Sequence, residues 1–179
     1  MRKRSNVLKK RYALDILRSN DCSEGLIRHC LAVSKNAVEI ASLVEIPVDK
    51  DLVKFGAILH DLGRCKTQGI EHAVVGGKIA RSMGLPEEVA NIIECHIGAG
   101  LTASEAEELG LPTRDFLPRT PEEKIVSYAD NLTMGSDMGT FERALGRFKK
   151  IIGEGHPAVQ RFISQHEEIM NWMASGVSK

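Results

Sequence analysis

The chain has 179 residues, of which 42% are hydrophobic, 27% charged and 4% aromatic, and its 24 basic and 24 acidic side chains cancel to no net charge. This composition is typical of one soluble domain. The zero net charge and the scarcity of aromatic rings argue against a nucleic-acid-binding protein. No segment has the roughly 18 apolar residues of a membrane span, and the basic N-terminus lacks the apolar core of a secretory signal. We therefore expect a cytoplasmic protein without a membrane partner.

Apolar residues recur with a period near 3.6 along the whole chain, and strand signals are nearly absent, which predicts an all-α fold. We expect a single-domain bundle of about seven to eight helices, near residues 6–19, 24–45, 49–63, 71–83, 86–97, 121–134, 139–153 and 157–174. Ser23 is suited to cap the second helix, and Thr120, Pro121 and Glu123 form a capping box at the start of another. The longest stretch without clear periodicity, 98–120, is expected to form a lid or binding loop with one short helical turn.

Two further features of the sequence bear on partners. Six basic residues fall within the first 11, at Arg2, Lys3, Arg4, Lys9, Lys10 and Arg11. A run this short is more often a solvated helix start than a surface for RNA or lipid. The four cysteines (Cys22, Cys30, Cys65 and Cys95) show no C-x-x-C spacing, and we expect them to be reduced and mostly buried.

Six residues of the types that bind metals fall on the predicted buried sides of five helices: His29, His60, Asp61, His72, His96 and Asp130. One such histidine alone is more often a hydrogen-bonded core residue than a ligand, and His166 lies on a similar apolar stripe with no function assigned. The whole set is different, because burying Asp61 as an unpaired anion is costly. Helical bundles build metal sites from side chains on facing helices, so a shared metal site is the economical interpretation.

The order and surroundings of these residues resemble the HD superfamily of metal-dependent phosphohydrolases. Its H…HD…D signature is met by His29 in RHCLAVSKNAVEIA, by His60 and Asp61 in KFGAILHDLGR, and by Asp130 in EKIVSYADNL. The resemblance covers roughly residues 23–135. It implies one HD domain over 1–179, with the core at 23–135 and with helices 6–19 and 139–174 as additions.

The two remaining histidines, His72 and His96, make the chain similar to the dinuclear members of the superfamily. By that resemblance, His29, His60, Asp61 and Asp130 hold one metal, and His72 and His96 hold a second, with Asp61 bridging. Imidazole and carboxylate donors suit iron, manganese, cobalt, nickel or zinc. The family favours iron or manganese.

The HDLGR segment is also close to the HDIGK motif of the cyclic-dinucleotide phosphodiesterase branch that carries a GYP motif. Here no GYP follows, Ile97 stands where that branch has a second histidine, and Gly25 stands where it has a glutamate. Hydrolysis of cyclic-di-GMP is therefore not expected. Arg64 occupies the lysine position of the motif and keeps the positive charge as a planar fork.

The expected function is hydrolysis of a nucleotide or another small phosphorylated compound, mono- or diester, by a metal-activated hydroxide oriented by Asp61. The cations nearest in sequence, Arg64 and Lys66, are candidates to stabilise the developing charge, and each is equally suited to be a solvated residue after a helix end. Arg114 and Arg119, in the 98–120 loop, are further candidates to bind substrate.

Two alternatives stay open. One is a non-catalytic regulatory module that binds a nucleotide or a metal. The other is a di-iron oxygenase resembling the inositol oxygenase branch. A homo-oligomer is compatible with the sequence, which names no protein partner.

Overall fold

The structure is a computed structural model that describes residues 9–174, and within this range it confirms the all-α prediction with nine α-helices. The helices are α2 (Lys10–Ser19), α3 (Glu24–Leu43), α4 (Lys50–Leu59), α5 (His72–Ser82), α6 (Glu87–Cys95), α7 (Ala103–Glu108), α8 (Pro121–Leu132), α9 (Phe141–Ile152) and α10 (Pro157–Ala174), with the 3-10 helix η1 (Leu62–Cys65) after α4. The structure also has a small antiparallel hairpin that was not predicted, β1 (Thr133–Met134) and β2 (Asp137–Met138); β1 falls at the end of the helix expected at 121–134.

Several helix starts follow from the predicted capping chemistry. The Ser23 side chain accepts a hydrogen bond from the Leu26 amide at the start of α3. The predicted capping box is present at α8, where Thr120 and Glu123 each bond to the other's main chain.

Of the basic N-terminal residues, Arg2, Lys3 and Arg4 lie outside the described residues, as does the start of the helix predicted at 6–19. Lys9, Lys10 and Arg11 are exposed.

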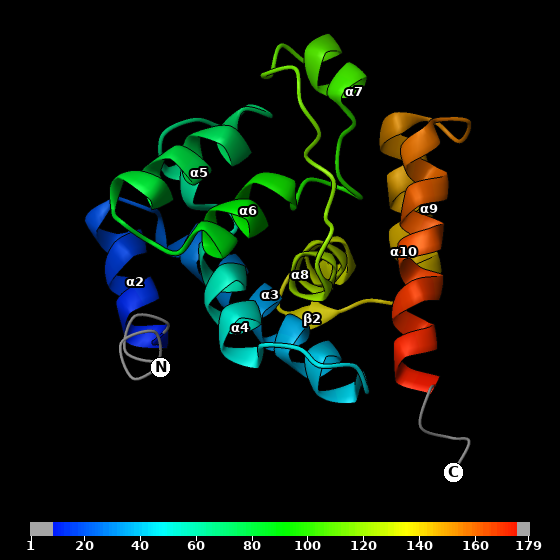
Figure 1. Cartoon of the computed structure of the whole chain (residues 1–179), viewed down its shortest axis with the longest axis horizontal. Helices are drawn as coiled ribbons and strands as arrows, with labels where there is room; N and C mark the ends of the chain where they lie inside the picture. Colours follow the sequence, from blue (N-terminus) through cyan, green and yellow to red (C-terminus); the bar gives the residue numbers. More distant parts are fainter. Residues whose placement is uncertain (1–8, 175–179) are drawn as a thin grey trace.

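The core lies where α3, α4, α6 and α8 meet, and its largest fully buried side chains include Phe55, Ile58, Ile92 and Ile125. In Figure 1, α8 is seen end-on, between the other three of these helices and the α9–α10 pair. The α9–α10 pair is held by aromatic packing, because the Phe162 ring lies 5.2 Å from that of Phe148. No helix within residues 9–174 is both long and apolar enough to cross a membrane.

The 98–120 segment, expected to be a loop, is well anchored. Leu101 and Phe116 exchange main-chain hydrogen bonds of 3.3 and 2.8 Å, which fold the segment back on itself around α7. Phe116 then packs into a second small apolar cluster with Val74 and Ala106.

The expectation that all four cysteines are reduced is wrong for one pair. Cys22 and Cys65, 43 residues apart in sequence, form a disulfide with a Cα–Cα distance of 4.7 Å. The bond links the residues just before α3 to the end of η1, two segments that no local pattern in the sequence connects. Cys30 and Cys95 are free and buried, as expected.

Candidate metal centre

The six predicted ligand residues meet at one point in the core. His29 lies in α3, His60 and His96 directly follow α4 and α6, Asp61 precedes η1, His72 opens α5, and Asp130 lies near the end of α8. Their ligand atoms form three overlapping groups, each within 4.8 Å: His29, His60 and Asp61; His60, His96 and Asp130; and Asp61, His72 and His96. Each group can hold a metal ion.

Three histidines are oriented by the same device. The Nδ1 atoms of His60, His72 and His96 lie 2.8, 2.7 and 2.7 Å from the carbonyl oxygen three residues earlier in the chain. A carbonyl only accepts hydrogen bonds, so each Nδ1 carries the proton and each Nε2 turns a lone pair toward the cluster. This arrangement fixes the ring orientation of a metal ligand.

These inward lone pairs have no adequate partner in the protein. The Nε2 of His60 is fully buried and makes no hydrogen bond. The Nε2 atoms of His72 and His96 lie 3.2 Å apart, and two facing lone pairs would repel each other. A divalent cation would satisfy all three atoms, so the residues fit a metal site.

The Asp61 carboxylate divides the cluster into two halves. Its Oδ2 lies 3.7 Å from the Nε2 of His29 and 3.6 Å from that of His60. Its Oδ1 lies 3.2 Å from the Nε2 of His72 and 3.4 Å from that of His96. We call these groups the His29 half and the His72 half. Asp130 belongs to the first, because its Oδ1 lies 3.1 Å from the Nε2 of His29.

Burial and mutual charge shift the pKa values of these groups. Burial alone would raise the pKa of Asp61, but the neighbouring His60, His72 and His96 hold it far below its usual range. The pKa of Asp130 is lowered in the same way, against burial, by His60 and His29. Burial alone would lower the pKa of His60, but the two carboxylates outweigh it and raise this pKa well above the usual value. Without a metal, a second proton, on Nε2 of His60, therefore takes the place of the inward lone pair and supplies positive charge to the centre.

The two candidate cations that follow Asp61 in sequence, Arg64 and Lys66, are placed differently. The Arg64 Nε donates to Asp61 Oδ1 at 2.8 Å, so its guanidinium lies directly beside the centre. The Lys66 Nζ instead donates to the Asn20 carbonyl at 3.2 Å, at the end of α2. Of this pair, the structure brings only Arg64 together with the metal ligands.

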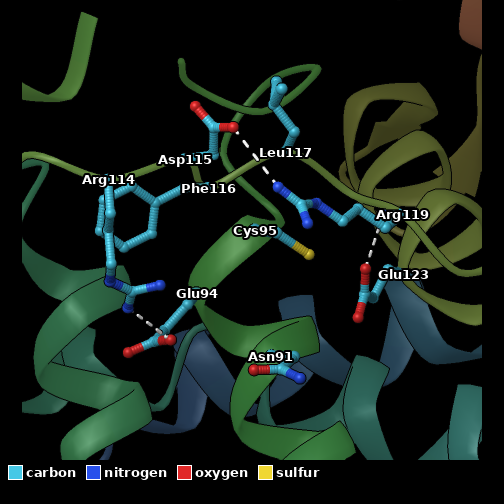
Figure 2. Close-up of a pocket in the computed structure, with 9 residues that line it drawn as sticks. All are labelled: Asn91, Glu94, Cys95, Arg114, Asp115, Phe116, Leu117, Arg119 and Glu123. Atoms are coloured by element: carbon cyan, nitrogen blue, oxygen red, sulfur yellow. Dashed lines mark hydrogen bonds and ion pairs between the residues drawn. The ribbon is translucent and has the colours of Figure 1, made fainter. Parts of the chain in front are cut away.

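Arg114 and Arg119 line a separate cavity of about 370 Å³ beside α6, which includes none of the six cluster residues. Figure 2 shows the Arg114 guanidinium directed at Glu94, with a contact of 2.7 Å. Arg119 lies 3.4 Å from Asp115, and its main-chain amide donates to Glu123 at 2.6 Å. Both are kept on the outer side of the segment by these carboxylates, and the structure does not bring them together with the metal ligands.

Two residues that the sequence analysis did not single out lie next to the centre. Asn131 directly follows the ligand Asp130, and its side chain donates to the Gly98 carbonyl at 2.7 Å. Arg147 of α9 donates from Nη2 to the Asn131 carbonyl at 2.7 Å. The position after a ligand was a usable signal for Asn131, whereas nothing in the sequence linked α9 to this site.

The HD domain family matches residues 26–135 of the chain, a range that includes every residue of the cluster. The chain belongs to the HD domain family. The matched range falls within the 23–135 of the resemblance, and it confirms the HD superfamily as this chain's family.

Several relatives are similar over different shares of their length. An uncharacterized protein of Methanocaldococcus jannaschii is 49% identical, over 89% of this chain and 95% of that protein. The tRNA (cytidine(56)-2'-O)-methyltransferase of Picrophilus torridus is 39% identical over 87% of this chain, which spans only 45% of that enzyme. Ribonuclease Y of Petrotoga mobilis is 30% identical over 72% of this chain and 22% of the ribonuclease.

A solved structure supports the fold. The HD domain of the L. monocytogenes phosphodiesterase PgpH, in complex with cyclic-di-AMP, aligns over 89% of this chain and 95% of its own, with a TM-score of 0.57. Sequence identity is 16%, so this likeness shows the HD fold alone.

Proposed function

We propose that this chain is a phosphohydrolase that binds two divalent metal ions and hydrolyses a phosphodiester bond in a nucleotide substrate. The observation that carries the proposal is the divided Asp61 carboxylate, with Oδ2 toward the His29 half and Oδ1 toward the His72 half. In this proposal each half holds one ion and Asp61 contacts both. Iron or manganese is the proposed metal, and the same donors suit zinc, cobalt or nickel.

The residues around the ions have separate tasks. When bound, such ions would polarise the phosphate oxygens and lower the pKa of a water molecule between them. Arg64, fixed through Nε to Asp61, has further N–H groups that can donate to phosphate oxygens as negative charge builds. The side chains of His29 and Asp130 are 35% and 22% exposed, and so give a phosphate access from solvent.

The choice of a phosphodiester rests on the relatives. A ribonuclease and a cyclic-di-AMP-binding phosphodiesterase both contain a segment similar to this chain. Both names concern ribonucleotides joined by phosphodiester bonds. We therefore favour a linear or cyclic ribonucleotide substrate over a sugar phosphate.

A second candidate function comes from the methyltransferase of Picrophilus torridus, in which a similar segment occupies 45% of a chain named for another activity. In such a protein, the segment could serve as a binding module without turnover. Stoichiometric nucleotide binding without any product would favour this alternative.

The test is product release by protein loaded anaerobically with manganese or iron. The substrates are linear and cyclic dinucleotides, short oligoribonucleotides, nucleoside monophosphates and sugar phosphates. We compare Asp61→Asn with Asp51→Asn, a matched change at an exposed position of α4. Asp61→Asn should lower turnover by at least about 100-fold, because even outer partners of metal ligands contribute about 10- to 100-fold. Asp51→Asn should retain it. Full turnover by Asp61→Asn would exclude the proposal.

A further inference from the structure

A cavity of about 670 Å³ lies between the 97–109 segment and α9. We propose that it binds the nucleoside of a substrate whose phosphate is held at the metal centre. The side chains of α9 would make the site prefer phosphates that carry a base over those that do not. This inference rests on the proposed function and names the substrate class of the same site. The volume is within the range of about 300–1,000 Å³ typical of small-molecule sites.

None of the six cluster residues lines the cavity, but three residues next to them do. Its lining includes Arg64, which contacts Asp61 at 2.8 Å. It also includes Ile97 and Asn131, which directly follow the ligands His96 and Asp130 in the chain. A phosphate beside Arg64 would therefore have its attached group directed into this cavity.

Arg147 supplies a second cation at the same end. One Nη2 hydrogen bond to the Asn131 carbonyl holds its guanidinium one residue away from Asp130. Arg147 is exposed, and no carboxylate within residues 9–174 forms an ion pair with it. Its remaining N–H groups are free to bind an anion, and Arg64 and Arg147 together suit the phosphate end of a nucleotide.

Much of the remaining lining is aliphatic, with Ile70, Ile97, Leu101, Leu109, Ile151 and Ile152. The lining also includes the Phe148 ring, His156 and the carboxylates of Glu105 and Glu108, of which Glu105 is paired with Arg161 at 2.7 Å. Leu109 and Ile151 are 48% and 73% exposed, unusually high fractions for large apolar side chains facing a cavity. The flat faces of a nucleobase match such walls, whereas the hydroxyl groups of a sugar would lose hydrogen bonds to water.

A smaller cavity beside His29 offers a contrast. It has a volume of about 320 Å³ and is lined by Gly25, Arg28, His29, Gly135 and Ser136. This lining has no aliphatic side chain, so of the two spaces adjoining the centre the one beside α9 suits a base. Because α9 covers Phe141–Ile152, beyond the family match at 26–135, the part of the wall that α9 supplies lies outside the family core.

The test measures binding of three probes to the manganese-loaded protein by calorimetry: AMP, ribose 5-phosphate and decyl phosphate. The variants are Ile151→Asp, at a position exposed enough to leave the fold intact, and Arg147→Ala. The control is Arg143→Ala, which removes another exposed arginine of α9 that does not line the cavity.

We expect AMP to bind at least about tenfold more tightly than ribose 5-phosphate, which a base in the cavity requires. Ile151→Asp should weaken AMP by about tenfold and leave ribose 5-phosphate within about twofold. Arg147→Ala should weaken both phosphates by about 10- to 100-fold, and Arg143→Ala should weaken neither.

Equal affinities for AMP and ribose 5-phosphate would overturn the inference, as would an Ile151→Asp variant with normal AMP binding. Tighter binding of decyl phosphate than of AMP would also overturn it, in favour of an alkyl-chain substrate.

Hydrolysis of bis(p-nitrophenyl) phosphate, which has no nucleoside, is measured in parallel. If this hydrolysis persists while the AMP results fail, only the inference falls. If it is absent while the AMP results hold, only the proposed function falls.

Discussion

The Cys22–Cys65 disulfide should be a major source of stability. Its loop of 43 residues corresponds to about 13 cal/mol/K of unfolded-state entropy, or about 4 kcal/mol at 25 °C. At about 2.1 cal/mol/K per residue, a chain of 179 residues has an unfolding entropy of about 380 cal/mol/K. Reduction of the disulfide should therefore lower Tm by about 10 °C.

The assay is thermal unfolding with and without tris(2-carboxyethyl)phosphine, on the wild type and on the double variant Cys22→Ser/Cys65→Ser. The reductant should lower the Tm of the wild type to that of the double variant and leave the variant unchanged. Cys30 and Cys95 remain in both proteins and control for other effects of reduction. Alkylation under denaturing, non-reducing conditions should label two cysteines in the wild type.

Two results would refute this reasoning. Four labelled cysteines in air-oxidised protein would show that the bond does not form. A Tm change below about 2 °C on reduction would show that the closed loop does not restrict the unfolded chain as the entropy relation requires.

Three other predictions concern the centre and its surroundings. Removal of metal by a chelator should lower the free energy of unfolding by about 2.7 kcal/mol, relative to protein in metal at 100 times the Kd for that metal. Thermal scans of Asp61→Asn should show no fall in Tm when the chelator is added. Because the pKa of His60 is raised in the metal-free fold, His60 contributes stability that is fully present below its unfolded pKa of about 6.5. This contribution is lost as the pH rises through the folded pKa. The lowered pKa values of Asp61 and Asp130 contribute stability that is present above their unfolded pKa of about 3.9. Burial lowers the pKa of His96, which removes stability as the pH falls below about 6.5. The metal-free Tm should therefore be highest near pH 6.5. Metal binding at pH 7 should release protons, measurable by calorimetry in buffers of different ionisation enthalpy. Glu94→Ala should lower the free energy of unfolding, measured with a denaturant, by about 1–3 kcal/mol because it removes the partner of Arg114. Turnover should stay unchanged. A loss of turnover in folded protein would show that the cavity lined by Arg114 belongs to the active site.

The convergence of the six His and Asp residues could be predicted from the sequence because it depends on residue type, order and periodicity. Local geometry was harder. The helices predicted at 49–63 and 86–97 end earlier, at Leu59 and Cys95, so His60 and His96 lie just beyond helix ends rather than within them. Apolar periodicity continues past each end, because the following residues are buried as well, and it therefore could not locate the end.

Long-range placement was beyond the sequence. Arg114 and Arg119 lie in a segment that directly follows a ligand, but the path of that segment is set by the Leu101–Phe116 pairing, which no local signal indicates. Arg147 contacts the Asn131 carbonyl because α9 packs against the end of α8. The Cys22–Cys65 pair likewise depends on how η1 meets the start of α3.

The positions of the ligands at helix ends explain how a chain without net charge can form a cation site. α4 and α6 both end at the centre, and their C-termini carry partial negative charge that favours cations. The Nδ1 protons of His60 and His96 satisfy carbonyls of these last turns, so one ring both ends a helix and directs Nε2 at the metal. On the other side, a Cβ atom at Gly63 would lie 1.8 Å from the His72 carbonyl oxygen, so only glycine lets η1 approach α5 this closely. That contact helps to set the distance between Asp61 and the His72 half, the two groups that would hold the second ion.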